Sequence, residues 1–190
     1  MENARSDKSR RSGALALRAR TSASDHWQTY WERERKHTRR VEQENWETPK
    51  RADWIERIRA AVRNAPGPVV LAAHSLGCAA VAHLARQATP SELARIKGAL
   101  LVAPSDVESP KYPPGTDGFV PMPLERLPFK AAVVISSDDE WVTPERARQF
   151  ASAWGARIVE VGAKGHLNSA SKLGSWPEGQ ALLRDLGLDS

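Results

Sequence analysis

The sequence predicts an α/β fold in which a mostly parallel central sheet carries helices on both faces. Short apolar runs rich in β-branched residues recur along the chain from Pro68 onward, and stretches with helical spacing separate them. Strands that are apolar throughout are buried on both faces, as in parallel sheets. Alternating strands and helices favour right-handed crossovers that place helices above and below the sheet.

The predicted strands, in chain order, cover residues 14–17, 68–73, 98–103, 131–136 and 157–161. The three middle runs are continuous and apolar, whereas the last is the weakest. The first is assigned because Leu15 and Leu17 alternate with alanine, which is the period of a strand.

The predicted helices cover residues 25–36, 52–64, 76–87, 144–154 and 177–186. Helix 52–64 gathers its large apolar side chains on one face. Helix 76–87 is made of small apolar residues, which suits close packing on a sheet. Helix 144–154 follows Thr143, a suitable N-cap, and starts with proline.

A chain of 190 residues suits one domain. We expect a disordered basic N-terminal tail over residues 1–12 and a single domain over 13–190. The proline-rich segment 110–128 is short and polar, which argues against a buried, lipase-like acyl channel. No apolar run approaches the ~20 residues needed to cross a bilayer, and no secretory signal pattern is found. Cys78 is the single cysteine, which fits a reducing compartment, and a cytoplasmic location is expected.

The formal charge of +5 is unevenly distributed. Residues 1–40 hold 11 Lys and Arg against 5 Asp and Glu, whereas the remaining 150 hold 17 against 18. The basic excess therefore belongs to one N-terminal stretch, and a solvated arm is the favoured interpretation. Nucleic-acid binding through this arm is a third-ranked hypothesis, and membrane binding is not expected.

The segment Ala73–Gly77, with the sequence AHSLG, follows an apolar strand directly and opens the small-residue helix. A nucleophilic serine on a sharp strand–turn–helix connection is expected in this context. Such a turn needs small neighbours two residues on either side, and Ala73 and Gly77 supply them, although alanine replaces the usual first glycine. Ser75 is therefore the candidate nucleophile, and the N–H of Leu76 is the candidate oxyanion donor.

A serine hydroxyl needs a general base, and the base needs a carboxylate to orient it. His166 lies in a short loop after the last predicted strand, where the base is expected. Asp139 is the preferred acid because it precedes Val142 by three residues. Asp138 is the second choice and Glu140 the third.

Each of these residues alone has an ordinary structural explanation, as a helix N-cap, a loop residue or a turn. Their order along the chain, each just past the end of a strand, favours a catalytic triad. Among the other histidines, His74 is expected to point away from the site, His83 to lie in the core or at the surface, and His37 to belong to a charged run. No metal and no cofactor are predicted, because no cluster with ligand spacing and no phosphate loop is present.

The chain resembles the small retinoblastoma-binding-protein-9-like serine hydrolases over about residues 25–186. The matching stretches are HSLG at 74–77, Asp139, Gly165-His166, Asp25–Gln28 with Trp31, Val41–Gln43, Asn45–Pro49, Leu101–Asp106, Arg146-Ala147, Ala153–Gly155 and Gly174–Gly179. The resemblance implies a single-domain α/β hydrolase of three layers, without a large lid domain, that acts on small ester or amide-like substrates.

One stretch departs from this family. Its members carry a glycine-containing loop before the Asp-His-Trp segment, and that loop supplies the second oxyanion N–H. Here no glycine lies between Gly13 and Gly67, and Arg18 and Arg20 stand in the stretch 17–24, where a tight turn is expected. Loss of one oxyanion donor typically costs ~10²–10³ in turnover, so reduced activity is an open alternative.

The leading hypothesis is a serine esterase-like hydrolase for small acyl substrates, with Trp27, Phe119 and Trp141 as candidate pocket residues. Trp54 and Trp154 are expected in the core on their helix faces. The alternative, from a different class, is a catalytically impaired hydrolase-fold protein that acts as a binding or interaction module. The sequence does not determine the oligomeric state.

Overall fold

A parallel six-stranded sheet organises the molecule in the computed structural model, which describes residues 12–17 and 24–187. The strand order is β2-β1-β3-β4-β5-β6, and every neighbouring pair is parallel. The strands are β1 (Gly13–Leu17), β2 (Thr38–Arg40), β3 (Val69–His74), β4 (Ile96–Val102), β5 (Lys130–Ile135) and β6 (Arg157–Glu160).

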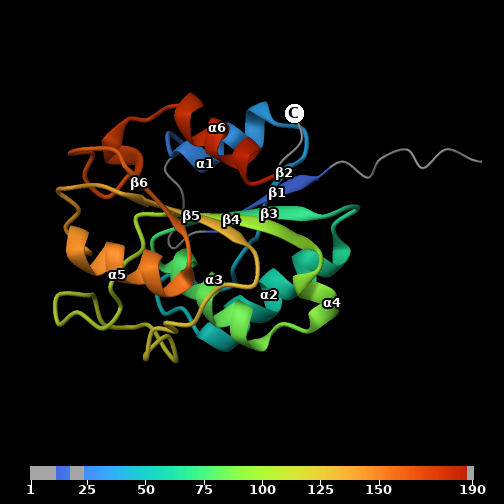
Figure 1. Cartoon of the computed structure of the whole chain (residues 1–190), viewed down its shortest axis with the longest axis horizontal. Coiled ribbons are helices and arrows are strands. Elements are labelled where there is room, and N and C mark those ends of the chain that lie inside the picture. Colours follow the sequence, from blue (N-terminus) through green and yellow to red (C-terminus); the bar gives the residue numbers. More distant parts are fainter. Residues whose placement is uncertain (1–11, 18–23, 188–190) are drawn as a thin grey trace, which may run out of the picture.

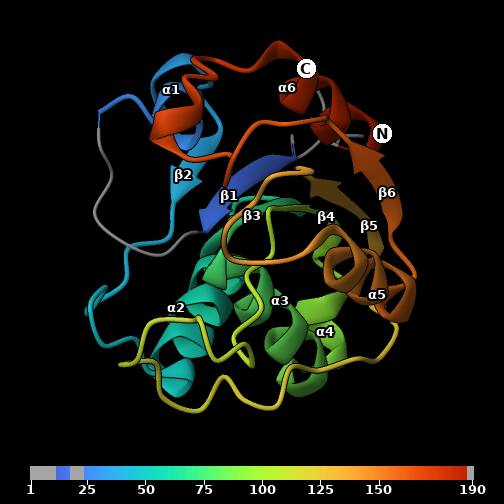
Figure 2. The ribbon, with the colours of Figure 1, turned by 90° about the vertical axis from the view of Figure 1, so that its left-hand side faces the viewer.

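Helices cover both faces of this sheet and make three layers (Figure 1). They are α1 (Trp27–Glu34), α2 (Arg51–Asn64), α3 (Leu76–Gln87), α4 (Pro90–Leu93), α5 (Pro144–Trp154) and α6 (Pro177–Asp185), with a 3₁₀ turn, η1, at Ser169–Ser171. Helices α1 and α6 lie on one face and α2 to α5 on the other, as Figure 2 also shows. The predicted three-layer α/β fold is therefore confirmed.

Two apolar clusters fill the spaces between the layers. The larger lies under α2, α3 and α5, and the smaller lies under α1 and α6. Every residue of β3 is buried, because this central strand contacts both clusters. The expected core tryptophans Trp54 and Trp154 are 2% and 1% exposed.

Some elements were not expected from the sequence. Strand β2 at the sheet edge consists of Thr38 and two arginines, so it has no apolar run from which a strand could be predicted. Helix α4 has a single turn and depends on its capping box more than on an apolar face. Most of the predicted tail lies outside the described residues, but Ser12 within it is buried.

No helix in the described part of the chain is both long and apolar enough to span a membrane.

Candidate active site

Ser75 occupies a strained turn between β3 and α3. Its φ and ψ angles are 57° and −126°, outside the regions that L-residues ordinarily adopt. The Ser75 N–H donates to the carbonyl of Val102 on the neighbouring strand, which holds the turn at the carboxyl end of the sheet. Although Ser75 stands at the N-cap position of α3, its side chain makes no capping hydrogen bond. Its hydroxyl is directed to other partners.

The structure brings the side chains of Ser75, His166 and Asp139 together in one hydrogen-bonded line. His166 Nε2 lies 2.9 Å from Ser75 Oγ, and His166 Nδ1 lies 2.9 Å from both carboxylate oxygens of Asp139. The Asp139 side chain is 1% exposed and that of His166 is 7% exposed, so both contacts are shielded from water. Because all strands are parallel, the loops after β3, β5 and β6 meet at the same sheet edge.

Asp138 has a different position from its neighbour. Its Oδ1 accepts hydrogen bonds from the Ser136 hydroxyl at 2.8 Å and from the Gly165 N–H at 2.7 Å. These bonds lower the pKa of Asp138 below its ordinary value, the Ser136 hydroxyl having the largest effect. Asp138 thus fastens the loop that carries His166, while Asp139 contacts the imidazole ring.

The expectation that His74 points away from the site is wrong. Its Nε2 donates to the main-chain carbonyl of His166 at 2.7 Å, and the two rings are 4.8 Å apart. Trp27 makes a similar contact with the same loop, because its indole N–H donates to the carbonyl of Leu167 at 2.9 Å. Leu167 has a φ of 50°, so this loop is held in a conformation that rarely forms unaided.

Ser105 also reaches the site, although sequence reasoning did not select it. Its Oγ lies 2.8 Å from Ser75 Oγ, and the residue is 1% exposed. It lies in the loop after β4, one strand away from β3. Its place after a strand's carboxyl end, within the APSD stretch that resembles the family, was the signal that could have identified it.

The three candidate pocket residues lie in different surroundings. Trp141 is half-buried, and its ring lies 6.4 Å from that of His166. Trp27 is 1% exposed and packs against Trp31, and Phe119 is 1% exposed and packs edge-on against Trp54 in the core under α2. Such burial leaves Trp27 and Phe119 as packing residues, because neither presents a surface to a substrate. Only Trp141 retains the geometry of a pocket residue.

The oxyanion donors are described in part. Leu76 is the first residue of α3, where main-chain N–H groups lack partners within the helix. The predicted second donor lies in the stretch 17–24, of which residues 18–23 fall outside the described part of the chain. At the start of that stretch, the Gln28 amide donates to the carbonyls of Leu17 and Ala72 and fastens the end of β1 to β3.

Other titratable groups lie away from this chemistry. Burial lowers the pKa of His83, whose ring bonds to the carbonyl of Phe119 beneath α3. Burial also disfavours the charged form of the Cys78 thiol, which in this case raises its pKa. Within residues 12–17 and 24–187, no group of three or more His, Cys, Asp or Glu side chains could hold a metal ion.

Comparison with known proteins places the chain in a family. A sequence profile described as "Serine hydrolase" matches residues 19–185. The chain belongs to the Serine hydrolase family. Its function is accordingly that of a hydrolase. A search of curated proteins finds no match.

Solved structures of hydrolases share this fold. A YdeN-like hydrolase from Pectobacterium atrosepticum has a TM-score of 0.79 and 27% identity, with 93% of this chain and 90% of that one covered. The ydeN product of Bacillus subtilis has a TM-score of 0.68 and 18% identity, with 93% and 98% covered. Est1E from Butyrivibrio proteoclasticus has a TM-score of 0.62 and 13% identity, with 95% and 90% covered.

Proposed function

We propose that this member of the Serine hydrolase family is an esterase-like enzyme that cleaves small ester or related acyl substrates through an acyl-enzyme. The observation that carries the proposal is the 2.9 Å contact between Ser75 Oγ and His166 Nε2, with Asp139 at the opposite nitrogen of the ring. This arrangement lets a serine hydroxyl attack near neutral pH, which it cannot do without a base.

The proposed reaction follows from which atoms carry protons. The Asp139 carboxylate accepts the Nδ1–H of His166, so Nε2 has a free lone pair for the Ser75 proton. Ser75 Oγ attacks the acyl carbon, and we assign the Leu76 N–H, at the start of α3, as a donor to the oxygen that becomes negative. His166 then gives the proton to the leaving group, and water releases the acyl group by the reverse sequence.

The substrate class is supported by likeness to solved esterases. Est1E has also been solved with ferulic acid bound, at a TM-score of 0.66 and 15% identity. An esterase from Thermogutta terrifontis shares the fold with a TM-score of 0.64. We further propose membership of the retinoblastoma-binding-protein-9-like branch, a cytoplasmic location, and a reaction that uses neither metal nor cofactor.

A fluorophosphonate probe tests this proposal directly. We expect the wild-type protein to be labelled and Ser75→Ala to remain unlabelled, with turnover of p-nitrophenyl acetate lost in parallel. Labelling that persists in Ser75→Ala would remove Ser75 from the role of nucleophile. A folded wild-type protein with neither labelling nor turnover would favour the binding-module alternative. The observation behind that alternative is the glycine-free stretch 14–24.

A further inference from the structure

A second serine, Ser105, contacts the proposed nucleophile, in addition to the histidine described above. Ser105 Oγ lies 2.8 Å from Ser75 Oγ. Within residues 12–17 and 24–187, this is the one hydrogen bond that the Ser105 hydroxyl makes. Ser105 is 1% exposed, and a buried hydroxyl is costly unless it is bonded, so this contact determines the orientation of the hydroxyl.

The loop that carries Ser105 is fixed on both sides. Before it, Ala103 has a φ of 48°, an uncommon angle for a residue with a Cβ, and its N–H donates to the carbonyl of Val134. After it, the Asp106 N–H donates to the carbonyl of Trp141, and the Asp106 carboxylate pairs with Arg146 of α5 at 3.3 Å. The main chain on both sides of Ser105 is thus fixed beside the nucleophile by contacts that do not involve Ser75.

Counting protons assigns the direction of the hydrogen bond between the two serines. Each hydroxyl has a single proton. With Nδ1–H of His166 donated to Asp139, the neutral ring accepts at Nε2, so the proton of Ser75 is directed to His166. The proton between the two serines must then come from Ser105, and Ser75 Oγ accepts it.

We propose that Ser105 is a further catalytic residue, whose hydroxyl donates a hydrogen bond to Ser75 Oγ and thereby orients and polarises the nucleophile for attack. The inference rests on the proposed function, since it assigns a role in the same reaction. The bond selects the side-chain rotamer of Ser75 that points at His166 Nε2. It also favours the partial negative charge that Oγ gains as its proton leaves.

The reaction of Ser75 with a fluorophosphonate is a direct probe of this step. The Oγ–P bond forms, the P–F bond breaks, fluoride departs with the bonding pair, and the Ser75 proton passes to His166 Nε2. Ser105 keeps its own proton throughout. Its contribution is therefore expected in the rate of this first covalent step.

Three variants of Ser105 separate a chemical role from a packing role. Ser105→Ala removes the hydroxyl, Ser105→Cys fills the same space with a weak donor, and Ser105→Thr keeps a hydroxyl. The measurement is the second-order rate constant of fluorophosphonate labelling. We expect about a tenfold loss in the alanine and cysteine variants, as for removal of one hydrogen bond to a charge-bearing atom, and recovery in the threonine variant. Thermal unfolding of each variant verifies the fold.

The outcomes distinguish this inference from the proposed function. Wild-type labelling rates in Ser105→Ala, or restoration of the rate by Ser105→Cys, would overturn the role of the hydroxyl while leaving Ser75 as nucleophile. Equal slowing in the alanine and cysteine variants, with unchanged unfolding temperatures, would support it. If Ser75→Ala were still labelled and mass spectrometry located the label on Ser105, the assignment of Ser105 as donor would be overturned together with the nucleophile.

Discussion

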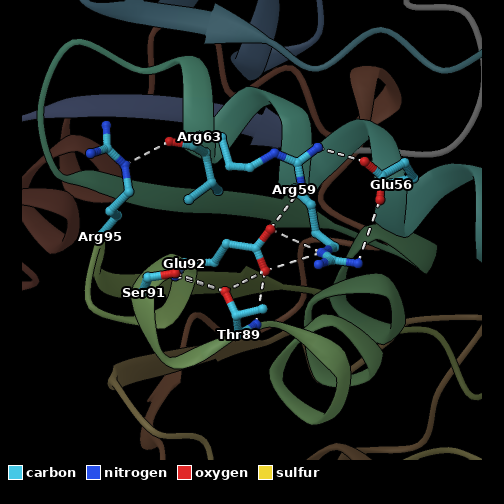
Figure 3. Close-up of polar contacts among 8 residues, drawn as sticks. Glu56, Arg59, Arg63, Thr89, Ser91, Glu92 and Arg95 are labelled. Carbon is cyan, nitrogen blue, oxygen red and sulfur yellow. Dashed lines mark hydrogen bonds and ion pairs between the residues drawn. The ribbon is translucent and has the colours of Figure 1, made fainter.

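Replacing Glu92 by glutamine is expected to destabilise the protein at neutral pH. The Glu92 carboxylate lies between helices α2 and α4, where its side chain is 5% exposed. It accepts from Arg59 Nε at 3.0 and 3.1 Å, from Arg63 Nη1 at 2.7 Å, and from the Thr89 N–H at 2.8 Å (Figure 3). Both arginines also contact Glu56, which completes the ion-pair cluster.

The pKa of Glu92 sets the size of the effect. Burial alone would raise this pKa, but the hydrogen bonds from Thr89, Arg59 and Arg63 outweigh it and lower the value from 4.5 to about 2. At ~1.4 kcal/mol for each tenfold change in proton affinity, that shift corresponds to at most about 3 kcal/mol. Because Arg63 is 43% exposed and solvent screens its charge, we expect about 2 kcal/mol.

The sign with pH follows from the lowered pKa. A carboxylate whose pKa is depressed in the folded state stabilises the protein above its unfolded pKa, and loses this contribution as the pH falls. The difference between wild type and Glu92→Gln should therefore be complete above about pH 5 and should shrink between about pH 4.5 and pH 2.

Urea unfolding followed by tryptophan fluorescence, repeated across this pH range, measures the difference. In a separate thermal scan at neutral pH, the unfolding temperature of Glu92→Gln should fall by about 4–8 °C for a domain of this size. The matched control is Glu44→Gln, because Glu44 pairs with Arg57 at 3.2 Å while 75% exposed, and it should cost less than about 0.5 kcal/mol. Equal stability of Glu92→Gln and wild type at pH 7, or a difference that persists unchanged at low pH, would refute the reasoning.

Three further predictions concern the site and the core. Asp139→Asn should lower kcat/KM for p-nitrophenyl acetate by about 10³–10⁴-fold, because an amide cannot hold the required histidine tautomer. Asp138→Asn should lower it by about tenfold at most, since Asp138 accepts from the Ser136 hydroxyl and the Gly165 N–H and so acts on the loop that carries His166. Comparable losses in the two variants would contradict these roles. Trp27→Phe should reduce the same activity several-fold, because it removes the indole N–H that donates to the carbonyl of Leu167, next to His166. Trp31→Phe is the matched control and should stay within about twofold, because the Trp31 indole donates to the carbonyl of Ser175, farther along the chain. Equal reductions would indicate general destabilisation. Burial raises the pKa of Cys78, so iodoacetamide should alkylate it only in concentrated urea, and rapid alkylation of the native protein would disprove this.

Much of the candidate site could be predicted because parallel topology converts chain order into proximity. Ser75, Asp139 and His166 each follow a strand that the sequence predicts, and parallel strands end at one edge. The spacing to Val142 favoured Asp139 over Asp138, and in the structure Asp139 is the residue that contacts the imidazole. Patterns of this kind are local, so they survive without knowledge of the tertiary contacts.

Contacts that depend on loop conformation could not be predicted in this way. The approach of Ser105 depends on the positive φ of Ala103, which nothing in the residue type announces. The His74 side chain reaches the loop that carries His166, but its partner there is a main-chain carbonyl 92 residues away in the sequence. Phe119 is an aromatic residue of the kind that lines pockets, but the path of its loop places the ring in the core.

The sequence by itself determined the three-layer architecture and the order of the candidate triad, because apolar periodicity and strand-end residues are properties of short segments. Tertiary structure alone decided which hydroxyl contacts Ser75 Oγ, which carboxylate fastens the Gly165 loop, and which tryptophan supports the residue after His166. The physical reason is that a hydrogen bond forms only within a few tenths of an ångström of its preferred length. Such precision arises from the packing of distant segments, and no local pattern encodes it.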